Sequence, residues 1–138
     1  ATWRLHGVDR MLREAWESGV ILAGISAGMI CWFEASVTDS FGRGLSPFHD
    51  GLGLLPGSAC PHYDSEPNRR PTYQQLIGEG ALPGGIAADD GAAVHFVGAE
   101  VVEAVSSRPN ACAYRVELRH GRVLEHPLET RYLDASPP

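Results

Sequence analysis

The motif GISAG, at positions 24–28, joins two segments whose patterns differ. Residues 20–25 form a short apolar run without alternation, which is typical of a parallel strand that is buried on both faces. Residues 27–34 fit a short helix. A serine between two glycines, with a strand entering and a helix leaving, is the pattern of a nucleophile elbow. The sequence therefore predicts an α/β fold in which Ser26 lies at the turn from strand to helix.

An elbow of this kind gives a serine a specific chemical setting. Its two glycines let the chain reverse without a clash of Cβ atoms, so that the Ser26 hydroxyl stays exposed at the end of the strand. The amide N–H of Ala27, at the start of the new helix, would then point to the place where an oxyanion forms. The alternative interpretation is a serine that only caps a helix between small neighbours.

Two further helices are expected from the periodicity of apolar residues. The first begins near position 5 and stops at Gly19, and its apolar side chains recur at helical spacing: Leu5, Val8, Leu12 and Trp16. The second covers residues 69–80, with Gly80 as its C-cap and with one apolar face formed by Tyr73, Leu76 and Ile77. Residues 38–61, rich in Gly, Pro, Ser and Asp, predict loops with at most one short strand.

Beyond position 85 the pattern is that of strands. These are expected over residues 86–88, 92–97, 100–105, 113–118 and 123–128. Short turns at 97–99 and 120–121 suit β-hairpins. The front half of the chain is therefore expected to be α/β and the back half antiparallel.

Charge and cysteine content exclude several classes of function. The net charge is -6, with 17 acidic residues against 11 basic ones, all Arg, so that nucleic-acid binding is not expected. The three cysteines, Cys31, Cys60 and Cys112, are widely spaced and contain no C-x-x-C pair, which fits neither a disulfide framework nor a zinc site. No apolar run is long enough to span a bilayer and no signal-peptide pattern is present, so we expect a cytoplasmic protein without a membrane partner.

A nucleophilic serine needs a base, and six histidines are available. His62 is the best placed, in the polar segment CPHYDSE at positions 60–66, where Pro61 restricts the chain. His49 is a weaker candidate in a flexible segment. The alternative for His62 is an ordinary loop histidine.

The third candidate feature is a pair of carboxylates, Asp89 and Asp90, directly before Gly91. They follow a short apolar strand, where carboxylates are costly unless they have partners. Either one is therefore a candidate for the acid that orients the histidine. The alternative is an ordinary Asp-Gly turn.

Three motifs together resemble the peptidase E (aspartyl dipeptidase) family of serine peptidases, which is related to cyanophycinase. They are GISAGMICWF at 24–33, CPHYDSE at 60–66 followed by RRP at 69–71, and GIAADDG at 85–91, and the ending TRYL at 130–133 fits as well. The resemblance implies a class I glutamine amidotransferase-like fold, a mainly parallel sheet flanked by helices, with antiparallel hairpin strands at the C-terminus. It further implies one catalytic domain over residues 1–134, the C-terminal portion of the family domain. The low-complexity end of the sequence predicts a disordered tail at 135–138.

The resemblance also implies roles for the candidate residues. Ser26 matches the nucleophile and His62 the general base. Asp90 matches the orienting acid, because the acidic residue of the family motif directly precedes the glycine, and Asp89 is the fallback. The Ala27 amide matches one donor of the oxyanion hole.

Substrate-binding residues are implied in the same way. Arg69 and Arg70 match the family arginine on the helix after the histidine motif, where a guanidinium would bind an acidic side chain. Arginine at a helix start opposes the helix dipole, which favours a ligand-facing role for at least one of them. Asp39 resembles another acidic residue downstream of the nucleophile, which would shape the site.

The function implied is that of a serine peptidase without metal or cofactor, which hydrolyses short peptides, above all dipeptides with an N-terminal Asp, through an acyl-enzyme. The partner is then a small peptide, and the sequence leaves a homodimer open. One departure is the lack of the family's Gly-rich loop, resembling GGGN, which supplies the second oxyanion donor. The first βα units of the family are expected to be absent. One alternative is a truncated non-catalytic domain. The other is a glutaminase, and the serine at position 26 argues against this second alternative.

Overall fold

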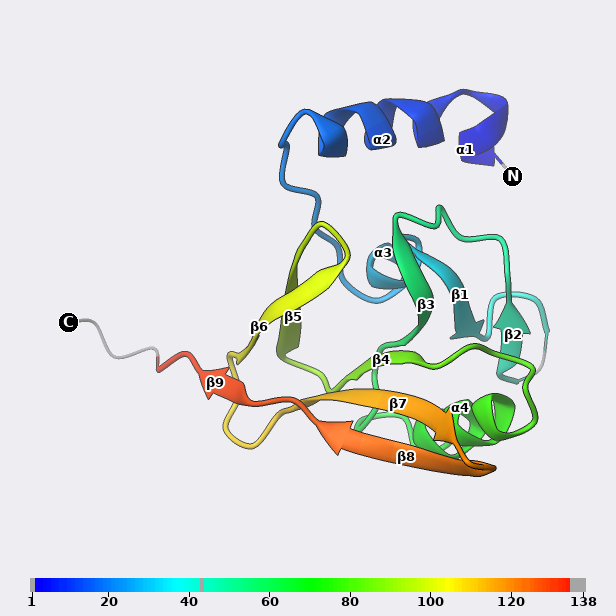
Figure 1. Cartoon of the computed structure of the whole chain (residues 1–138), viewed down its shortest axis with the longest axis vertical. Helices are drawn as coiled ribbons and strands as arrows, with labels where there is room; N and C mark the ends of the chain where they lie inside the picture. Colours follow the sequence, from blue (N-terminus) through cyan, green and yellow to red (C-terminus); the bar gives the residue numbers. More distant parts are fainter. Residues whose placement is uncertain (1, 43, 135–138) are drawn as a thin grey trace.

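The computed structural model describes residues 2–42 and 44–134 and has a mixed α/β architecture (Figure 1). The tail predicted at 135–138 lies outside the described residues. The helices are α1 (Thr2–Leu5), α2 (Val8–Glu17), α3 (Ala27–Ile30) and α4 (Arg69–Gly78). The strands are β1 (Phe33–Thr38), β2 (Ser46–Phe48), β3 (Leu55–Cys60), β4 (Gly85–Ala88), β5 (Ala92–Val97), β6 (Glu100–Ser106), β7 (Ala113–Arg119), β8 (Arg122–Pro127) and β9 (Thr130–Tyr132).

Two sheets organise the chain. The larger has six strands in the order β2-β1-β3-β4-β7-β8, and the smaller has the order β5-β6-β9. In the larger sheet β1, β3 and β4 are parallel neighbours, whereas β2, β7 and β8 pair antiparallel. The sheet is therefore mixed, with a parallel centre, and the expectation of a mainly parallel sheet is wrong for the described residues. The edge strands β2 and β8 each follow their antiparallel neighbour after a short loop, and a short loop can reach only an antiparallel neighbour.

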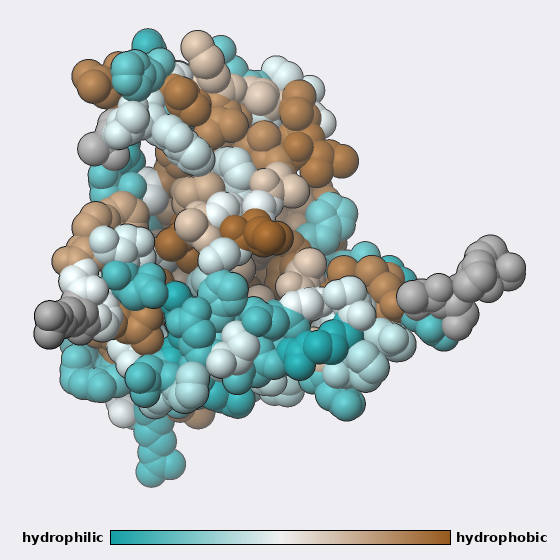
Figure 2. Space-filling view, turned by 180° about the vertical axis from the view of Figure 1, so that it is seen from behind, coloured by the Kyte–Doolittle hydropathy of each residue, from teal (hydrophilic) through white to brown (hydrophobic). Residues whose placement is uncertain are grey.

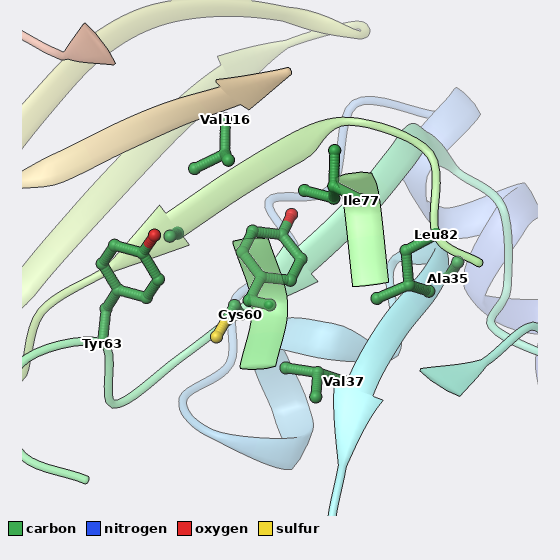
Figure 3. Packing of buried hydrophobic residues seen from close by; sticks show 9 residues of the cluster. Ala35, Val37, Cys60, Tyr63, Ile77, Leu82 and Val116 are labelled. Carbon is green, nitrogen blue, oxygen red and sulfur yellow. The ribbon is translucent and has the colours of Figure 1, made fainter. Parts of the chain in front are cut away.

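The two faces of the larger sheet are covered by different elements. On one face α4 encloses a buried cluster (Figure 3), formed by Ala35, Val37, Cys60, Tyr63, Tyr73, Ile77, Leu82, Ala87 and Val116. On the other face a second cluster, formed by Phe33, Leu55, Ala59 and Ile86, packs against α3 and the smaller sheet. Side chains alternate between the two clusters along β3, as the pleat of a strand requires. The parallel centre is thus buried on both sides.

The helix expected over residues 69–80 is confirmed as α4. Tyr73 and Ile77, four residues apart, lie on its inner face and are almost fully buried. The helix stops because Gly80 has a φ of 72°, and the Ala81 amide N–H donates back to the Leu76 carbonyl oxygen at 2.8 Å. This end of the helix directs the chain into β4.

All five strands expected beyond position 85 are present, and both hairpins are confirmed. Residues 98–99 connect β5 to β6, and Gly98 has a φ of 60°. Residues 120–121 connect β7 to β8, and both have positive φ. Positive φ is the conformation that tight hairpin turns require.

The segments between positions 20 and 61 differ from the structure that their sequence predicts. The buried strand expected at residues 20–25 is wrong: these residues pair with no strand of the described chain, and Ile21 and Ile25 are 92% and 89% exposed. The helix expected over 27–34 ends at Ile30, because β1 begins at Phe33. Residues 38–61, expected to be loops with at most one short strand, contain two strands, β2 and β3. An apolar run becomes a strand only where neighbouring strands accept its hydrogen bonds.

The N-terminal helix is confirmed but is interrupted. Gly7, with a φ of 70°, separates α1 from α2, and α2 ends two residues before Gly19. Neither helix contains a buried residue, and Figure 1 shows both apart from the sheets, beyond the segment that leads to α3. Within the described residues, no helix has the length and apolarity needed to cross a membrane.

Candidate active site

The backbone at Ser26 has the sharp turn expected of an elbow. Ser26 has a φ of 53° and a ψ of -119°, a region that costs a non-glycine residue about 1–3 kcal/mol. A Cβ on Gly24 would lie 2.3 Å from the Gly28 carbonyl oxygen, so only glycine fits at position 24. A Cβ on Gly28 would meet none of the described residues within 4 Å, so the need for the second glycine is not steric there.

Three side chains from separate segments form a continuous hydrogen-bonded chain. The Ser26 Oγ lies 2.8 Å from the His62 Nε2, across 36 residues of sequence. The His62 Nδ1 lies 2.7 Å from the Asp90 Oδ1, across 28 residues. With the imidazole hydrogen on Nδ1, His62 donates to the carboxylate and accepts from the serine hydroxyl. That arrangement can remove the hydroxyl proton as the serine attacks an electrophile.

The base and the acid follow neighbouring parallel strands. His62 comes two residues after the end of β3, and Asp90 two residues after the end of β4. The carboxyl ends of parallel strands meet at one edge of a sheet, where α/β proteins place their ligand sites. The Tyr63 amide N–H donates to the Ala88 carbonyl oxygen at 3.1 Å and ties the two loops together. His62 itself has a φ of 58°, so both Ser26 and His62 have a strained backbone conformation.

Asp89 and Asp90 point to opposite surroundings. Asp90 is exposed and contacts His62, and its pKa is lowered by hydrogen bonds from Ser65 and from His62. Asp89 is 6% exposed, and its Oδ2 accepts a hydrogen bond from the Cys112 amide at 2.9 Å. Burial raises the pKa of Asp89, and its Oδ1 has no hydrogen-bond partner among the described residues. The alternation of the chain therefore gives only Asp90 access to His62.

An ion pair next to Asp90 was not expected from the sequence. Asp64 Oδ1 accepts the Asp90 amide N–H at 2.9 Å, and Arg108 Nε donates to the Asp90 carbonyl oxygen at 3.0 Å. Asp64 and Arg108 also pair with each other. Asp64 lies in the polar motif of His62, which was a usable signal, whereas no pattern in the sequence marks Arg108.

A cavity of about 880 Å³ opens beside the three side chains. Its walls are mainly apolar and come from the segment before Ser26, from β5, and from the aromatic residues Trp16, Trp32 and Phe33. Figure 2 shows hydrophobic residues gathered in the upper half of the back face and hydrophilic residues below. The Ser26 hydroxyl therefore faces a largely apolar hollow.

The expected substrate ligands lie elsewhere. Arg69 is buried, donates to Glu66 at 2.7 Å and to the Val37 carbonyl oxygen at 3.3 Å, and has Asp39 at 3.8 Å. The structure thus brings Arg69 and Asp39 together, but neither lines the cavity beside Ser26. Their role as substrate ligands stays a prediction.

Arg70 has a different set of partners. It pairs with Glu125, and its guanidinium lies over the rings of Tyr63 and Tyr114 at about 5 Å. The hydrogen bond with Glu125 raises the pKa of Arg70, and the residue does not line the cavity beside Ser26. The unfavourable position of both arginines at the start of a helix is thus offset by carboxylates of the protein itself.

The Ala27 amide begins α3 next to Ser26 and donates no hydrogen bond to any residue that the structure describes. His49, the weaker candidate base, follows β2, and its side chain forms no hydrogen bond with the residues that the structure describes. No group of three or more His, Cys, Asp or Glu among the described residues could hold a metal ion. The roles of these residues in catalysis stay predictions.

Comparison with known proteins identifies the family. The model of peptidase family S51 matches residues 1–104. A protein of Bacillus subtilis (strain 168) named "Uncharacterized peptidase YgaJ" is 53% identical over 131 residues, which are 95% of this chain and 56% of that protein. The chain thus spans little more than half the length of this relative, and no solved structure matches it. The chain belongs to peptidase family S51, the peptidase E family that its three motifs resemble.

Proposed function

We propose that this chain carries the catalytic group of a serine peptidase that cleaves short peptides. The observation that supports the proposal most is the hydrogen-bonded series Ser26–His62–Asp90, with distances of 2.8 and 2.7 Å. Three residue types that act together in acyl transfer meet there from three segments, in a family of peptidases.

The proposed reaction proceeds through an acyl-enzyme. Ser26 Oγ attacks the peptide carbonyl carbon while its proton passes to His62 Nε2, and the Asp90 carboxylate stabilises the imidazolium. The Ala27 amide N–H donates to the oxyanion. The intermediate collapses as the C–N bond breaks, and His62 returns the proton to the leaving amine. A water molecule, deprotonated by His62, then attacks the ester carbonyl carbon. The bond between that carbon and Ser26 Oγ breaks, His62 returns the proton to Ser26 Oγ, and the carboxylate product leaves.

Selectivity for an N-terminal Asp is the finer part of the proposal and rests on the family resemblance. The guanidinium groups of Arg69 and Arg70 are engaged by Glu66 and Glu125. A pair of p-nitroanilides of Asp and Leu tests this part directly. A clear preference for Asp supports it, and equal rates contradict it.

We also propose that further βα units of a glutamine amidotransferase-like domain cover the apolar segment at 20–25 and supply the second oxyanion donor. Two observations support this: the exposure of Ile21 and Ile25, and the larger size of the B. subtilis relative. Extending the chain with upstream coding sequence should then protect the amides of residues 21–25 from hydrogen exchange and accelerate turnover. Unchanged exchange in the extended protein would contradict the proposal.

The experiment that tests the peptidase proposal measures turnover of Asp-p-nitroanilide and labelling by a fluorophosphonate, which reacts with activated serines. Ser26→Ala should abolish both. Ser40→Ala, a change at an exposed serine two residues after β1, is the matched control and should behave as the wild type. Equal signals from wild type and Ser26→Ala would refute the proposal. The absence of labelling in the chain and in its extended form would favour the alternative, a non-catalytic domain.

A further inference from the structure

The main chain of Asp90 is held from two sides by one ion pair. The Asp90 amide N–H donates to Asp64 Oδ1 at 2.9 Å, and the Asp90 carbonyl oxygen accepts from Arg108 Nε at 3.0 Å. The second oxygen of Asp64 pairs with the guanidinium of Arg108. Asp64 and Arg108 therefore close a ring around Asp90, which we call the Asp64–Arg108 clamp.

We propose that the Asp64–Arg108 clamp positions the Asp90 carboxylate for its contact with His62, so that Asp64 and Arg108 are positioning residues of the site. The inference rests on the proposed function, because it assigns a task to residues that support the same group. Asp64 lies two residues after His62, so the loop that carries the base also carries one half of the clamp. The clamp thus links the loops that follow β3 and β4.

Asp90 needs such support because packing does not immobilise it. Its side chain is 48% exposed, and the next residue, Gly91, has a φ of 82°. The loop that provides Arg108 also holds the following peptide, since the Ser107 amide N–H donates to the Gly91 carbonyl oxygen at 2.9 Å. A Cβ on Gly91 would lie 3.2 Å from the Arg108 Cβ, so the segments that contain Gly91 and Arg108 are in close contact. Polar contacts therefore fix the turn at residues 90–91.

The clamp is suited to geometry more than to global stability. The side chains of Asp64 and Arg108 are 31% and 50% exposed, and exposed ion pairs add little to the free energy of unfolding. Arginine is suited to this position because its planar group can donate to the carbonyl oxygen and to the carboxylate at once. Although burial raises the pKa of Asp64, the hydrogen bonds from Arg108 and from the Asp90 amide lower it overall, so the pair stays charged at neutral pH.

The test measures the tautomer of His62, which does not depend on turnover. In the chain labelled with ¹⁵N-histidine, nitrogen chemical shifts report whether the neutral imidazole carries its hydrogen on Nδ1 or Nε2, and His62→Gln assigns the signals. The clamp variants are Asp64→Ala and Arg108→Ala. Asp90→Ala removes the acceptor itself. Glu103→Ala is the matched control, because Glu103 pairs with Arg131 on the smaller sheet.

We expect the ratio of Nδ1–H to Nε2–H tautomer to fall about fivefold in Asp90→Ala, the order of one net hydrogen bond. Each clamp variant should lower it about twofold or more, and Glu103→Ala should leave it unchanged. A wild-type ratio in both clamp variants, together with a fall in Asp90→Ala, would overturn the clamp and leave the proposed function intact. A wild-type ratio in Asp90→Ala would overturn both, since the carboxylate would then not orient His62.

A second pair of variants covers the case in which an alanine variant does not fold. Asp64→Asn keeps an oxygen acceptor for the Asp90 amide, and Arg108→Gln keeps a donor near the Asp90 carbonyl oxygen, while each removes the ion pair. The clamp requires Asp64→Asn to retain more of the Nδ1–H tautomer than Asp64→Ala or, where the latter is unfolded, more than Asp90→Ala. Tautomer ratios equal to that of Asp90→Ala in both conservative variants would contradict the role assigned to the main-chain contacts.

Discussion

The segment that carries Ser26 and the sheet edge that carries His62 and Asp90 are built in opposite ways. Residues 20–25 are largely exposed, and the amides of residues 21–25 donate no hydrogen bond to any residue within 2–42 or 44–134. His62 and Asp90 follow β3 and β4, and the last three residues of each strand are buried. One side of the candidate site is therefore held by an extended core, and the other by the local geometry of an elbow.

The two parts of the site are therefore held in place by different sets of contacts. The base and the acid follow strands that pack against α4, and the Asp64–Arg108 clamp adds polar contacts to the main chain of Asp90. The position of Ser26 depends on the close approach of Gly24 to Gly28 and on the packing of α3 against β1 and β3. Changes in the sheet should thus affect stability and chemistry together, whereas changes before Ser26 should spare stability.

The largest difference between the two regions should appear in hydrogen exchange. Amides in β3 and β4 can exchange only when the sheet opens, at up to the global free energy of unfolding, about 5–15 kcal/mol. Amides of residues 21–25 have no such protection. We expect exchange rates that differ by at least about 10³-fold, measured by NMR or mass spectrometry. Comparable protection from exchange in β3, β4 and residues 21–25 would contradict a difference in local stability between the two regions.

A second contrast separates the two neighbouring carboxylates at the sheet edge. Asp90→Asn should lower the rate of fluorophosphonate labelling about 10³-fold or more, because an amide favours the wrong tautomer of His62. Asp89→Asn, directly beside it, should change the rate by less than about threefold, because Asp89 faces Cys112. Labelling kinetics under identical conditions measure both. A large loss of labelling rate in Asp89→Asn would contradict the assignment of Asp90 as the orienting acid.

Isoleucines of the two regions should differ in their contribution to stability. Ile77→Ala, at 1% exposure in the α4 cluster, should lower the free energy of unfolding by about 2–5 kcal/mol. Ile21→Ala, at 92% exposure, should change it by less than about 0.5 kcal/mol. Urea denaturation followed by circular dichroism provides both values. Similar losses would show that residues 20–25 are packed in solution.

The smallest expected effect is a pH dependence that has opposite signs at Asp89 and Asp90. Because burial raises the pKa of Asp89, its ionised form destabilises the fold. Asp89→Asn should therefore be more stable than the wild type at neutral pH, by about 1 kcal/mol. The gain should disappear as the pH falls through the raised pKa of Asp89.

Asp90→Asn is the matched control for this titration. Hydrogen bonds from Ser65 and His62 lower the pKa of Asp90, so its ionised form stabilises the fold above its unfolded pKa. Asp90→Asn should lose a little stability at neutral pH, and this loss should vanish as the pH falls through the lowered pKa. The effect is small because the side chain is exposed. The same sign in both variants would contradict the two environments.

Local patterns predicted the elements that depend on few neighbours. The amphipathic α2, the inner face of α4 and both hairpins followed from periodicity and turn residues. β3, with the sequence LPGSAC, carries no such signal. It is a strand because β1 and β4 flank it, and because the Ser58 hydroxyl is satisfied by the Tyr73 hydroxyl at 2.7 Å and by the Pro83 carbonyl oxygen. Such partners lie far away in sequence and are invisible to a local pattern.

The family and the turn at Ser26 follow from the amino-acid sequence alone, because three motifs and a requirement for glycine at position 24 are local properties of the chain. The fold, by contrast, settles that Asp90 and not Asp89 meets His62, since the direction of each side chain depends on how β4 pairs with β3 and β7. It alone brought Arg108 to Asp64, and it alone left residues 20–25 without strand neighbours in the described chain. These outcomes follow from long-range pairing, whose free energy depends on the whole arrangement of elements and not on any one of them.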